Sequence, residues 1–432
     1  MSCGSFVIVL LSACGGGGGS ALPVAQGPHS PAAPPANSNG TAAPAASAAP
    51  TPNAAPASAN HVATADYIGY GGSSSITASQ VASHLTWAET DSGRAGELSS
   101  AGVKTMEYVD PFRQSPKDPL YNSNSSTFSS DCSGNRIKIH YTGETSNVVQ
   151  YLMKPSSSSL VDILNGWENG EESRGHIDAF YFDDVDDLGG VPTNPCHVTQ
   201  GDWDASNASF IQASARPVIF SGLALSSDAA TLLDKSNAEG GVVEECYSRT
   251  SQPTPPYTTG EFWKHNENLE LAAASAGKRF FCYNNSNATA SSSVPLRSYV
   301  YASFLLTYSS SSSVLWDMFS TVSGFHVLPE TELVPSNSRV ATPSSVDALK
   351  SSSGVYVREY GACSLGGNSI GRCAAIVNSD SSAAHALPSL STSYAHTLSL
   401  SGSGVLDGGT ASAAGAAPPA KIPPETGIIA IQ

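Results

Sequence analysis

Short apolar runs alternate with longer segments of helical periodicity from residue 66 to about residue 345. Eight runs predict strands: 66–72, 103–111, 148–155, 178–187, 216–225, 240–248, 278–285 and 313–320. The segments that predict helices lie between them, at 77–90, 159–170, 228–238, 261–277 and 294–308. Eight such units predict a (β/α)₈ barrel. An open dinucleotide-binding sheet is disfavoured because no Gly-x-Gly-x-x-Gly follows the first run.

The rhythm changes after residue 345. Runs such as "GVYVREYG", "RCAAIVNS" and "TGIIAIQ" alternate apolar and polar residues, with Gly, Ser and Pro between them and no helix-length spacers. This pattern is typical of short antiparallel strands. We therefore expect an α/β fold, a TIM barrel over 61–344 followed by a small antiparallel β-sandwich over 345–432.

The first 60 residues contain no Asp, Glu, Lys or Arg. Residues 15–60 are almost entirely Gly, Pro, Ala, Ser and Asn, a composition with too little to bury for folding, so we expect a disordered linker. Residues 1–14 combine a short apolar run with "LSAC", Leu11 to Cys14, which resembles the bacterial lipobox. That resemblance implies a signal peptide, lipidation of Cys14 and a protein of the bacterial cell envelope, periplasmic or surface-exposed, or secreted.

The rest of the chain is acidic, with a formal net charge of −16, although only 13% of residues are charged. Like charges would oppose binding to nucleic acid or to anionic lipid, so we expect neither partner. The one expected membrane contact is the N-terminal lipid anchor, and we expect a monomer.

Six of the eight cysteines follow the leader segment. An even number in an exported protein predicts disulfides, although six cysteines allow fifteen pairings. Cys363 and Cys373 flank a Gly-rich turn between two strand-like runs, so we expect these two to pair. The spacing of Cys and His fits no zinc motif, and we expect no metal and no cofactor.

Polar residues end several of the predicted strands, although charge is scarce. They are Asp110, Asp183, Asp184, Glu244, Glu245, Tyr283, Asn284, Trp316 and Asp317. In a (β/α)₈ barrel, catalytic groups project from the carboxyl ends of the strands. An EF-hand starting at Asp184 is excluded by Leu188 and Pro195 at ligand positions, and Asp186 and Asp187 are interpreted as solvated or capping loop residues.

Two carboxylates on neighbouring strand ends match the needs of glycoside hydrolysis. One must be protonated to donate to the leaving oxygen, and the other must be ionised to attack carbon or to activate water. The runs ending in Asp183–Asp184 and in Glu244–Glu245 supply such a pair. Tyr70, Tyr108, Tyr181, Tyr283 and Trp316 lie near the same ends and are candidates to stack on sugar rings.

The run "IDAFYFDDVD" resembles the "DGxFLDxVD" signature of glycoside-hydrolase-like barrels, including glycoside hydrolase family 114 endo-α-1,4-polygalactosaminidases and related hypothetical glycosyl hydrolase groups. The run "GGVVEECYS" resembles "DGVVxES" of the same groups, with Gly240 where an acid is common. The resemblance implies a catalytic role for Asp183 and for Glu245. Because both acids are doubled and strand side chains alternate, Asp184 and Glu244 remain the alternatives.

These observations predict an exported glycoside hydrolase that cleaves a polysaccharide, for which an amino-sugar polymer would suit the acidic charge. Asp183 is the expected nucleophile or base, and Glu245 the expected general acid/base. The candidate substrate-binding residues are Tyr70, Asp110, Asp184, Asn284, Trp316 and Asp317. The alternative is a surface lipoprotein that binds carbohydrate on a TIM-barrel scaffold without catalysis.

Overall fold

The computed structural model describes residues 60–68, 76–139, 149–185, 188, 191, 193–225, 229–249, 256–286, 293–319, 327–339 and 342–432. For residues 285–286, 317–319 and 337 it describes the backbone alone. The expected signal peptide, the lipid site Cys14, the expected linker up to residue 59, Tyr70, Asp186 and Asp187 all lie outside these residues.

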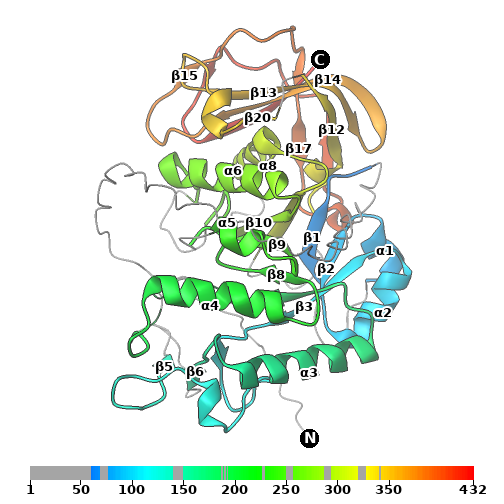
Figure 1. Cartoon of the computed structure of the whole chain (residues 1–432). Helices are drawn as coiled ribbons and strands as arrows, with labels where there is room; N and C mark the ends of the chain where they lie inside the picture. The colour runs from blue at the N-terminus through cyan, green and yellow to red at the C-terminus, as the bar shows by residue number, and fades with distance from the viewer. Residues whose placement is uncertain are drawn as a thin grey trace, which may run out of the picture.

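Eight parallel strands close into a barrel, which confirms the expected TIM-barrel fold (Figure 1). Their order around the barrel is β1-β11-β10-β9-β8-β7-β3-β2. The strands are β1 (Thr64–Tyr67), β2 (Trp87–Glu89), β3 (Lys104–Val109), β7 (Ala179–Phe182), β8 (Val218–Phe220), β9 (Ala238–Val243), β10 (Arg279–Ser286) and β11 (Ser313–Phe319).

Helices follow the strands and cover the outside of the barrel. They are α1 (Ala78–Ala82), α2 (Ser92–Ser100), α3 (Ser158–Arg174), α4 (Gln200–Ala213), α5 (Ala229–Leu233), α6 (Gly260–Ser275) and α8 (Val294–Thr307). Local sequence fixes several of their starts. Asp91 accepts the Arg94 amide at the start of α2, and Thr199 and Asp202 form a capping box on α4. Such caps satisfy amides that the first helical turn leaves without partners.

Several elements differ from the sequence-based prediction. The run 148–155 was expected in the barrel, but its strand β6 (Gln150–Leu152) pairs antiparallel with β4 (Arg113–Gln114) and β5 (Lys138–Ile139) in an outlying sheet. The second barrel strand is instead β2, inside a segment predicted to be helical. Its three residues are too few to show strand alternation beside the helical pattern of 77–85. Helices α2 and α4 were not predicted.

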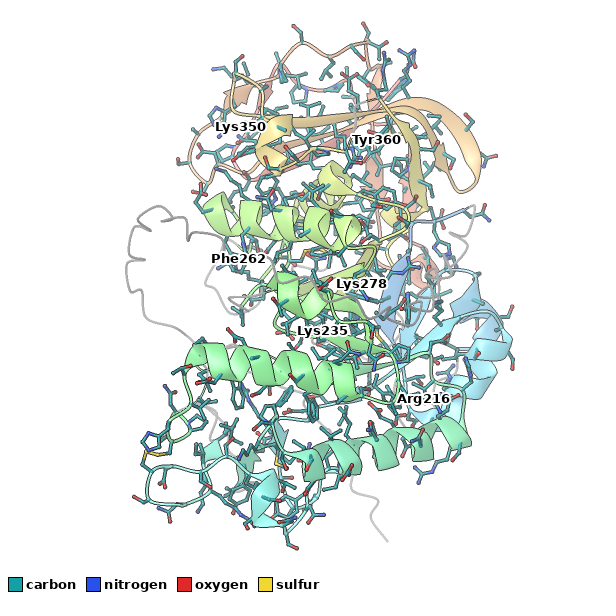
Figure 2. All side chains as sticks on the ribbon, in the orientation of Figure 1. Arg216, Lys235, Phe262, Lys278, Lys350 and Tyr360 are labelled. Atoms are coloured by element: carbon teal, nitrogen blue, oxygen red, sulfur yellow. A yellow bond between two sulfur atoms is a disulfide. The ribbon has the colours of Figure 1, made fainter. Side chains whose placement is uncertain are left out.

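Close approach between barrel strands explains Gly240. A Cβ atom built on this residue would lie 2.3 Å from the carbonyl oxygen of Arg279 on β10, which is shorter than a Cβ–oxygen contact can be. Gly240 and Arg279 are paired in register, so neither backbone can move away. Lys278, directly before β10, links this strand to β9 and to the residues that precede β9. Its Nζ donates to the carbonyl oxygens of Lys235 and Ala238 at 2.9 and 2.6 Å (Figure 2).

The C-terminal region forms antiparallel sheets, as expected. The main sheet has the order β12-β13-β14-β20-β16, and the pairs β15-β19 and β17-β18 lie beside it. The strands of these three sheets are β12 (Leu333–Ser338), β13 (Tyr356–Leu365), β14 (Asn368–Asn378), β15 (His385–Ala386), β16 (His396–Thr397), β17 (Ser399–Ser401), β18 (Thr410–Ser412), β19 (Lys421–Ile422) and β20 (Thr426–Ile431). Short 3₁₀ turns are η1 (Ser125–Thr127), η3 (Pro329–Glu332), η4 (Val346–Leu349) and η5 (Val405–Asp407).

One face of this sheet packs on α8, so that α8 lies between the sheet and the barrel (Figure 1). At Gly427 on β20, an added Cβ would lie 2.5 Å from the Cα of Tyr299 on α8, which shows how closely the two elements approach. Tyr360 and Ile431 of the sheet belong to the same buried apolar cluster as Leu305 of α8. The sheet and the barrel therefore share a hydrophobic core.

Three disulfides join Cys132 to Cys196, Cys246 to Cys282 and Cys363 to Cys373. The third is the pair expected from the turn between its cysteines. Such disulfides are typical of proteins that fold in an oxidising, extracellular or periplasmic compartment. Among the described residues, none of the helices has the length and apolar character needed to cross a bilayer.

Candidate active site

The inside of the barrel is filled by alternate residues of its strands. Aromatic residues dominate the upper layers, with Trp87 on β2, Tyr181 on β7, Tyr283 on β10 and Trp316 on β11. Because side chains alternate along a strand, the next inward positions toward the carboxyl ends include Glu89, Asp183 and Glu244. These carboxylates thus come to the carboxyl-terminal mouth of the barrel, the end where barrel enzymes carry out their chemistry.

Asp183 lies directly after β7 and is half-buried. The hydroxyl of Tyr108, on the neighbouring strand β3, donates to its Oδ2 at 2.9 Å. The amide of Asp184 donates to its Oδ1 at 2.8 Å. Both carboxylate oxygens therefore accept a hydrogen bond, an arrangement that suits an ionised and oriented carboxylate.

Asp184 turns away from this position. Its backbone has a φ of 56°, a left-handed conformation that is uncommon outside glycine, and its Oδ1 lies 2.8 Å from a guanidinium nitrogen of Arg113. Tight backbone geometry thus separates the two members of the doublet. Asp183 follows the inward positions of β7, and Asp184 is held by an ion pair with Arg113.

Asp110, after β3, lies beside this ion pair. Its Oδ1 accepts the amides of Phe112 and Arg113 at 2.9 and 2.8 Å. Burial raises the pKa of Asp110 well above its usual range, and the negative charges of Asp184 and Asp183 raise it further, while Arg113 opposes them. The surroundings of Asp110 thus disfavour its ionised form.

Glu244 directly follows β9 and continues its inward side. The hydroxyl of Tyr181 donates to its Oε1 at 3.3 Å. Burial raises the pKa of Tyr181 well above its usual range, and the charges of Asp183, Glu244 and Glu89 contribute in that order. The rings of Tyr108 and Tyr181 meet edge to face with centroids 5.8 Å apart. The two acids are therefore joined through a pair of contacting tyrosines.

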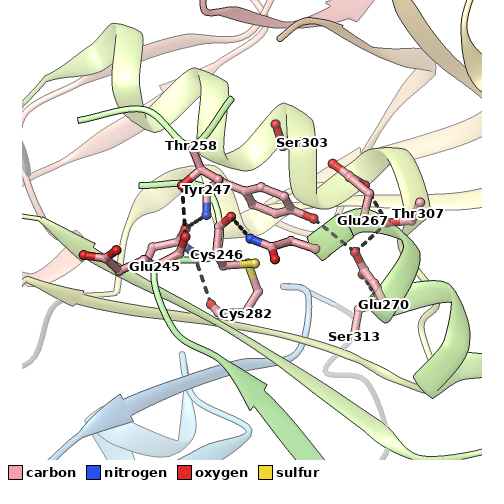
Figure 3. Close-up of a disulfide and its surroundings, with 12 residues drawn as sticks. Glu245, Cys246, Tyr247, Thr258, Glu267, Glu270, Cys282, Ser303, Thr307 and Ser313 are labelled. Atoms are coloured by element: carbon pink, nitrogen blue, oxygen red, sulfur yellow. Dashed lines mark hydrogen bonds between the residues drawn. A yellow bond between two sulfur atoms is a disulfide. The ribbon is translucent and has the colours of Figure 1, made fainter. Parts of the chain in front are cut away.

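Glu245, after β9, repeats the backbone geometry that Asp184 has after β7. Its φ of 53° is again left-handed, and its carbonyl oxygen accepts a 2.9 Å hydrogen bond from Oγ1 of Thr258. The following Cys246 forms the disulfide with Cys282 of β10 (Figure 3). In both doublets the first acid continues the inward face of its strand and the second begins the turn. This geometry favours Asp183 and Glu244, over Asp184 and Glu245, as the acids that face the mouth of the barrel.

The structure places the other predicted binding residues in different surroundings. Asn284 is only 1% exposed, and its side chain accepts the Tyr247 amide at 2.9 Å on the outer face of β10. Trp316 is also 1% exposed and packs under Tyr181 and Tyr283 inside the barrel. Neither lies at an open sugar-binding surface. The side chain of Asp317 is outside the described part of the structure.

Sequence reasoning missed Glu89 and Arg113. Glu89 was placed inside a predicted helix, so its inward position at the end of β2 was hidden. Arg113 follows Asp110 by three residues in an outlying strand, and only the folded chain shows its ion pair with Asp184. The spacing of Trp87 and Glu89, two inward positions on one strand, was the available signal for Glu89.

Within the described residues, one group has the ligand types and closeness for a metal ion, Cys132, Cys196 and His197. Its two sulfurs form a disulfide and offer no thiolate for coordination. The acids of the barrel mouth form no such group among the described side chains.

No known family model matches the chain, and no curated protein matches its sequence. Its fold is similar to that of several solved structures. The glycoside hydrolase domain of PelA from Pseudomonas aeruginosa is 10% identical, with 61% of this chain and 98% of that chain covered and a TM-score of 0.43. Ega3 from Aspergillus fumigatus, in a complex with galactosamine, is 12% identical, with 62% and 94% covered and a TM-score of 0.40.

A maltogenic α-amylase, AmyB from Thermotoga neapolitana, is 7% identical, with 85% of this chain and 98% of that chain covered and a TM-score of 0.44.

Proposed function

We propose that the protein is a glycoside hydrolase that cleaves a polysaccharide with two carboxyl groups at the carboxyl-terminal mouth of the barrel. One observation carries the proposal: Asp183 and Glu244 take inward positions on the fourth and sixth barrel strands and are joined through Tyr108 and Tyr181. Glycoside hydrolysis needs one carboxylate and one carboxylic acid on either side of the scissile bond.

Asp183 is the proposed nucleophile or base. A carboxylate that attacks an anomeric carbon or activates a water must be ionised and must keep a fixed direction. Two donors, the Tyr108 hydroxyl and the Asp184 amide, fix its two oxygens. Asp184 is a weaker candidate because its carboxylate pairs with Arg113.

The proposed general acid belongs to the doublet after β9. Glu245 is the residue implied by the family resemblance, and Glu244 is the one favoured by the inward register of β9 and by the Tyr181 hydrogen bond. Separate Glu244→Gln and Glu245→Gln variants distinguish them. Loss of hydrolysis in the first with activity kept in the second assigns the role to Glu244, and the reverse result assigns it to Glu245.

The proposed substrate is an amino-sugar polymer. The net charge of −16, together with Glu89, Asp183 and Glu244 at one mouth, would attract protonated amino groups and repel anionic polysaccharides. Lipid anchoring in the envelope and the monomeric state remain proposals from the sequence, as does the division at residue 344.

The test is a panel of polysaccharides digested with the purified chain and analysed by product mass. The panel contains α-1,4-linked galactosaminan, its N-acetylated form, a neutral α-glucan and an acidic polymer. Release of oligosaccharides by the wild type and not by a folded Asp183→Asn variant supports the proposal. Binding of a polymer with no product in any digest would instead indicate a non-catalytic carbohydrate-binding protein.

A further inference from the structure

The turn that follows Glu244 is held by barrel strand β10, by helix α6 and by Thr258. The Cys246 amide donates to the Tyr283 carbonyl at 2.9 Å, and its carbonyl accepts Nδ2 of Asn266 on α6 at 2.8 Å. The Tyr247 amide donates to Oδ1 of Asn284 at 2.9 Å. These bonds and the Cys246–Cys282 disulfide fix the backbone, and they leave the Tyr247 side chain to extend into the layer between barrel and helices (Figure 3).

The Tyr247 ring is fully buried, and its hydroxyl lies 3.5 Å from Oε2 of Glu270 on α6. Glu267 lies on the same helix, one turn before Glu270. Oγ1 of Thr307, on α8, lies 2.7 Å from an oxygen of each glutamate. Ser313 on β11 donates a further short hydrogen bond to Glu270. Four elements thus meet at this carboxyl pair (Figure 3).

Proton counting fixes the state of the pair. A threonine hydroxyl has one proton, so it can donate to only one of two acceptors at 2.7 Å, and the other contact requires a donor on the carboxyl side. At least one of Glu267 and Glu270 is therefore a neutral acid. Burial agrees with this count, because it raises the pKa of Glu267 well above its usual range and that of Glu270 to about 7.

The C-terminal sheet reaches the same cluster. Arg358 of β13 donates through one guanidinium nitrogen to the carbonyl oxygens of Leu306 and Tyr308, each at 3.0 Å. These two residues flank Thr307. The end of α8, and with it the Thr307 hydroxyl, is thus held by a side chain of the sheet.

We propose that Tyr247 is a positioning residue for Glu244, and that the Glu267–Glu270 pair, with Thr307 and Arg358 behind it, holds Tyr247 in place. The inference rests on the proposed function, because it makes Tyr247 a support for the glutamate doublet of the same site. It assigns to the C-terminal sheet a part in fixing the site from behind, without contact with the substrate.

The test compares Tyr247→Phe with the wild type in the full chain. The substitution keeps the ring and removes the hydroxyl that reaches the carboxyl pair. We expect kcat to fall about tenfold with KM unchanged within about twofold, because the acid loses alignment in the transition state while substrate binding is kept. Amide hydrogen exchange in residues 242–249 should become faster.

Tyr301→Phe is the matched control. Its hydroxyl is equally buried on α8 and donates to the Leu333 carbonyl instead of to the carboxyl pair. This variant should keep wild-type kcat and wild-type exchange in residues 242–249. Glu267→Gln should keep both as well, since an amide can donate to Thr307 as a neutral acid does. Thr307→Val, which removes the shared hydroxyl, should behave as Tyr247→Phe and serves if that variant does not fold.

Unchanged exchange in residues 242–249 of Tyr247→Phe and Thr307→Val would overturn the inference, whether or not the wild type cleaves a glycan. Unchanged kcat in both variants of an active enzyme would overturn it as well, and so would an equal loss in Tyr301→Phe. A wild type that cleaves no polymer contradicts the proposed function and, with it, the catalytic part of the inference. Hydrogen exchange tests the positioning contact independently of that activity.

Discussion

The hydroxyl of Tyr108 donates a 2.9 Å hydrogen bond to Oδ2 of Asp183, across neighbouring barrel strands. Tyr108→Phe removes this donor and keeps the ring that packs on Tyr181. A hydrogen bond to a charged group contributes about 1.5–3 kcal/mol, so kcat should fall at least about tenfold. Steady-state kinetics on the cleaved polymer measure the change. Tyr121→Phe, which alters a tyrosine of the outlying region, should leave kcat unchanged, and an equal loss there would contradict this account.

The two members of the first acid doublet should differ in kind. Asp183→Asn should abolish hydrolysis with little change in melting temperature. Asp184→Asn should lower the free energy of unfolding by about 2–4 kcal/mol, because it leaves the buried guanidinium of Arg113 without its 2.8 Å partner. Thermal unfolding and activity of both variants separate these effects. The assignment fails if Asp184→Asn alone removes activity while the melting temperature stays unchanged.

Stability should decrease with rising pH because of Glu107. Burial raises the pKa of this carboxyl on β3 to about 8, with Glu171 and Asp91 adding to the shift. A carboxyl whose folded-state pKa exceeds its unfolded value stabilises the fold below about pH 4.5 and loses that contribution as pH rises toward about 8. Glu107→Gln removes the titration, so the variant should exceed the wild type in free energy of unfolding at about pH 8.5, by on the order of 2 kcal/mol.

Denaturant unfolding at about pH 5.5 and about pH 8.5 measures the effect of Glu107. Glu97→Gln, at an exposed position of α2, is the matched control and should follow the wild type at both pH values. If the difference in free energy of unfolding between the wild type and Glu107→Gln is the same at both pH values, this carboxyl does not resist ionisation in the fold.

The disulfides should differ in their effect on activity. Replacing Cys246 and Cys282 by Ala opens a loop with a sequence separation of 36 and releases the turn after Glu244. We expect a loss of about 4 kcal/mol in stability together with a lower kcat. Replacing Cys363 and Cys373, which are 10 residues apart in the C-terminal sheet, should cost about 3 kcal/mol and leave kcat unchanged. Equal kcat in the two double variants would contradict a special role for the first disulfide.

The sequence predicted the strands that carry the site, because β7 and β9 are apolar runs ended by acids. It did not predict β2, because the three residues of this strand adjoin a segment with helical spacing. It placed residues 148–155 in the barrel because an antiparallel strand and a parallel barrel strand can have the same apolar pattern. The choice within each acid doublet depends on the left-handed φ of Asp184 and Glu245. Glycine is the residue that usually indicates such a φ in a sequence, and neither position is a glycine. The Cys246–Cys282 pairing is likewise set by the adjacency of β9 and β10.

The central claim is that the acids at the ends of β7 and β9 together cleave a glycosidic bond. Reducing-end release from galactosaminan by the wild type, Asp183→Asn, Glu244→Gln and Glu245→Gln tests it most directly. We predict release by the wild type, and a loss of at least about a thousandfold in Asp183→Asn and in one glutamate variant, with Glu244→Gln favoured. Activity retained in Asp183→Asn, or in both glutamate variants, would contradict the account.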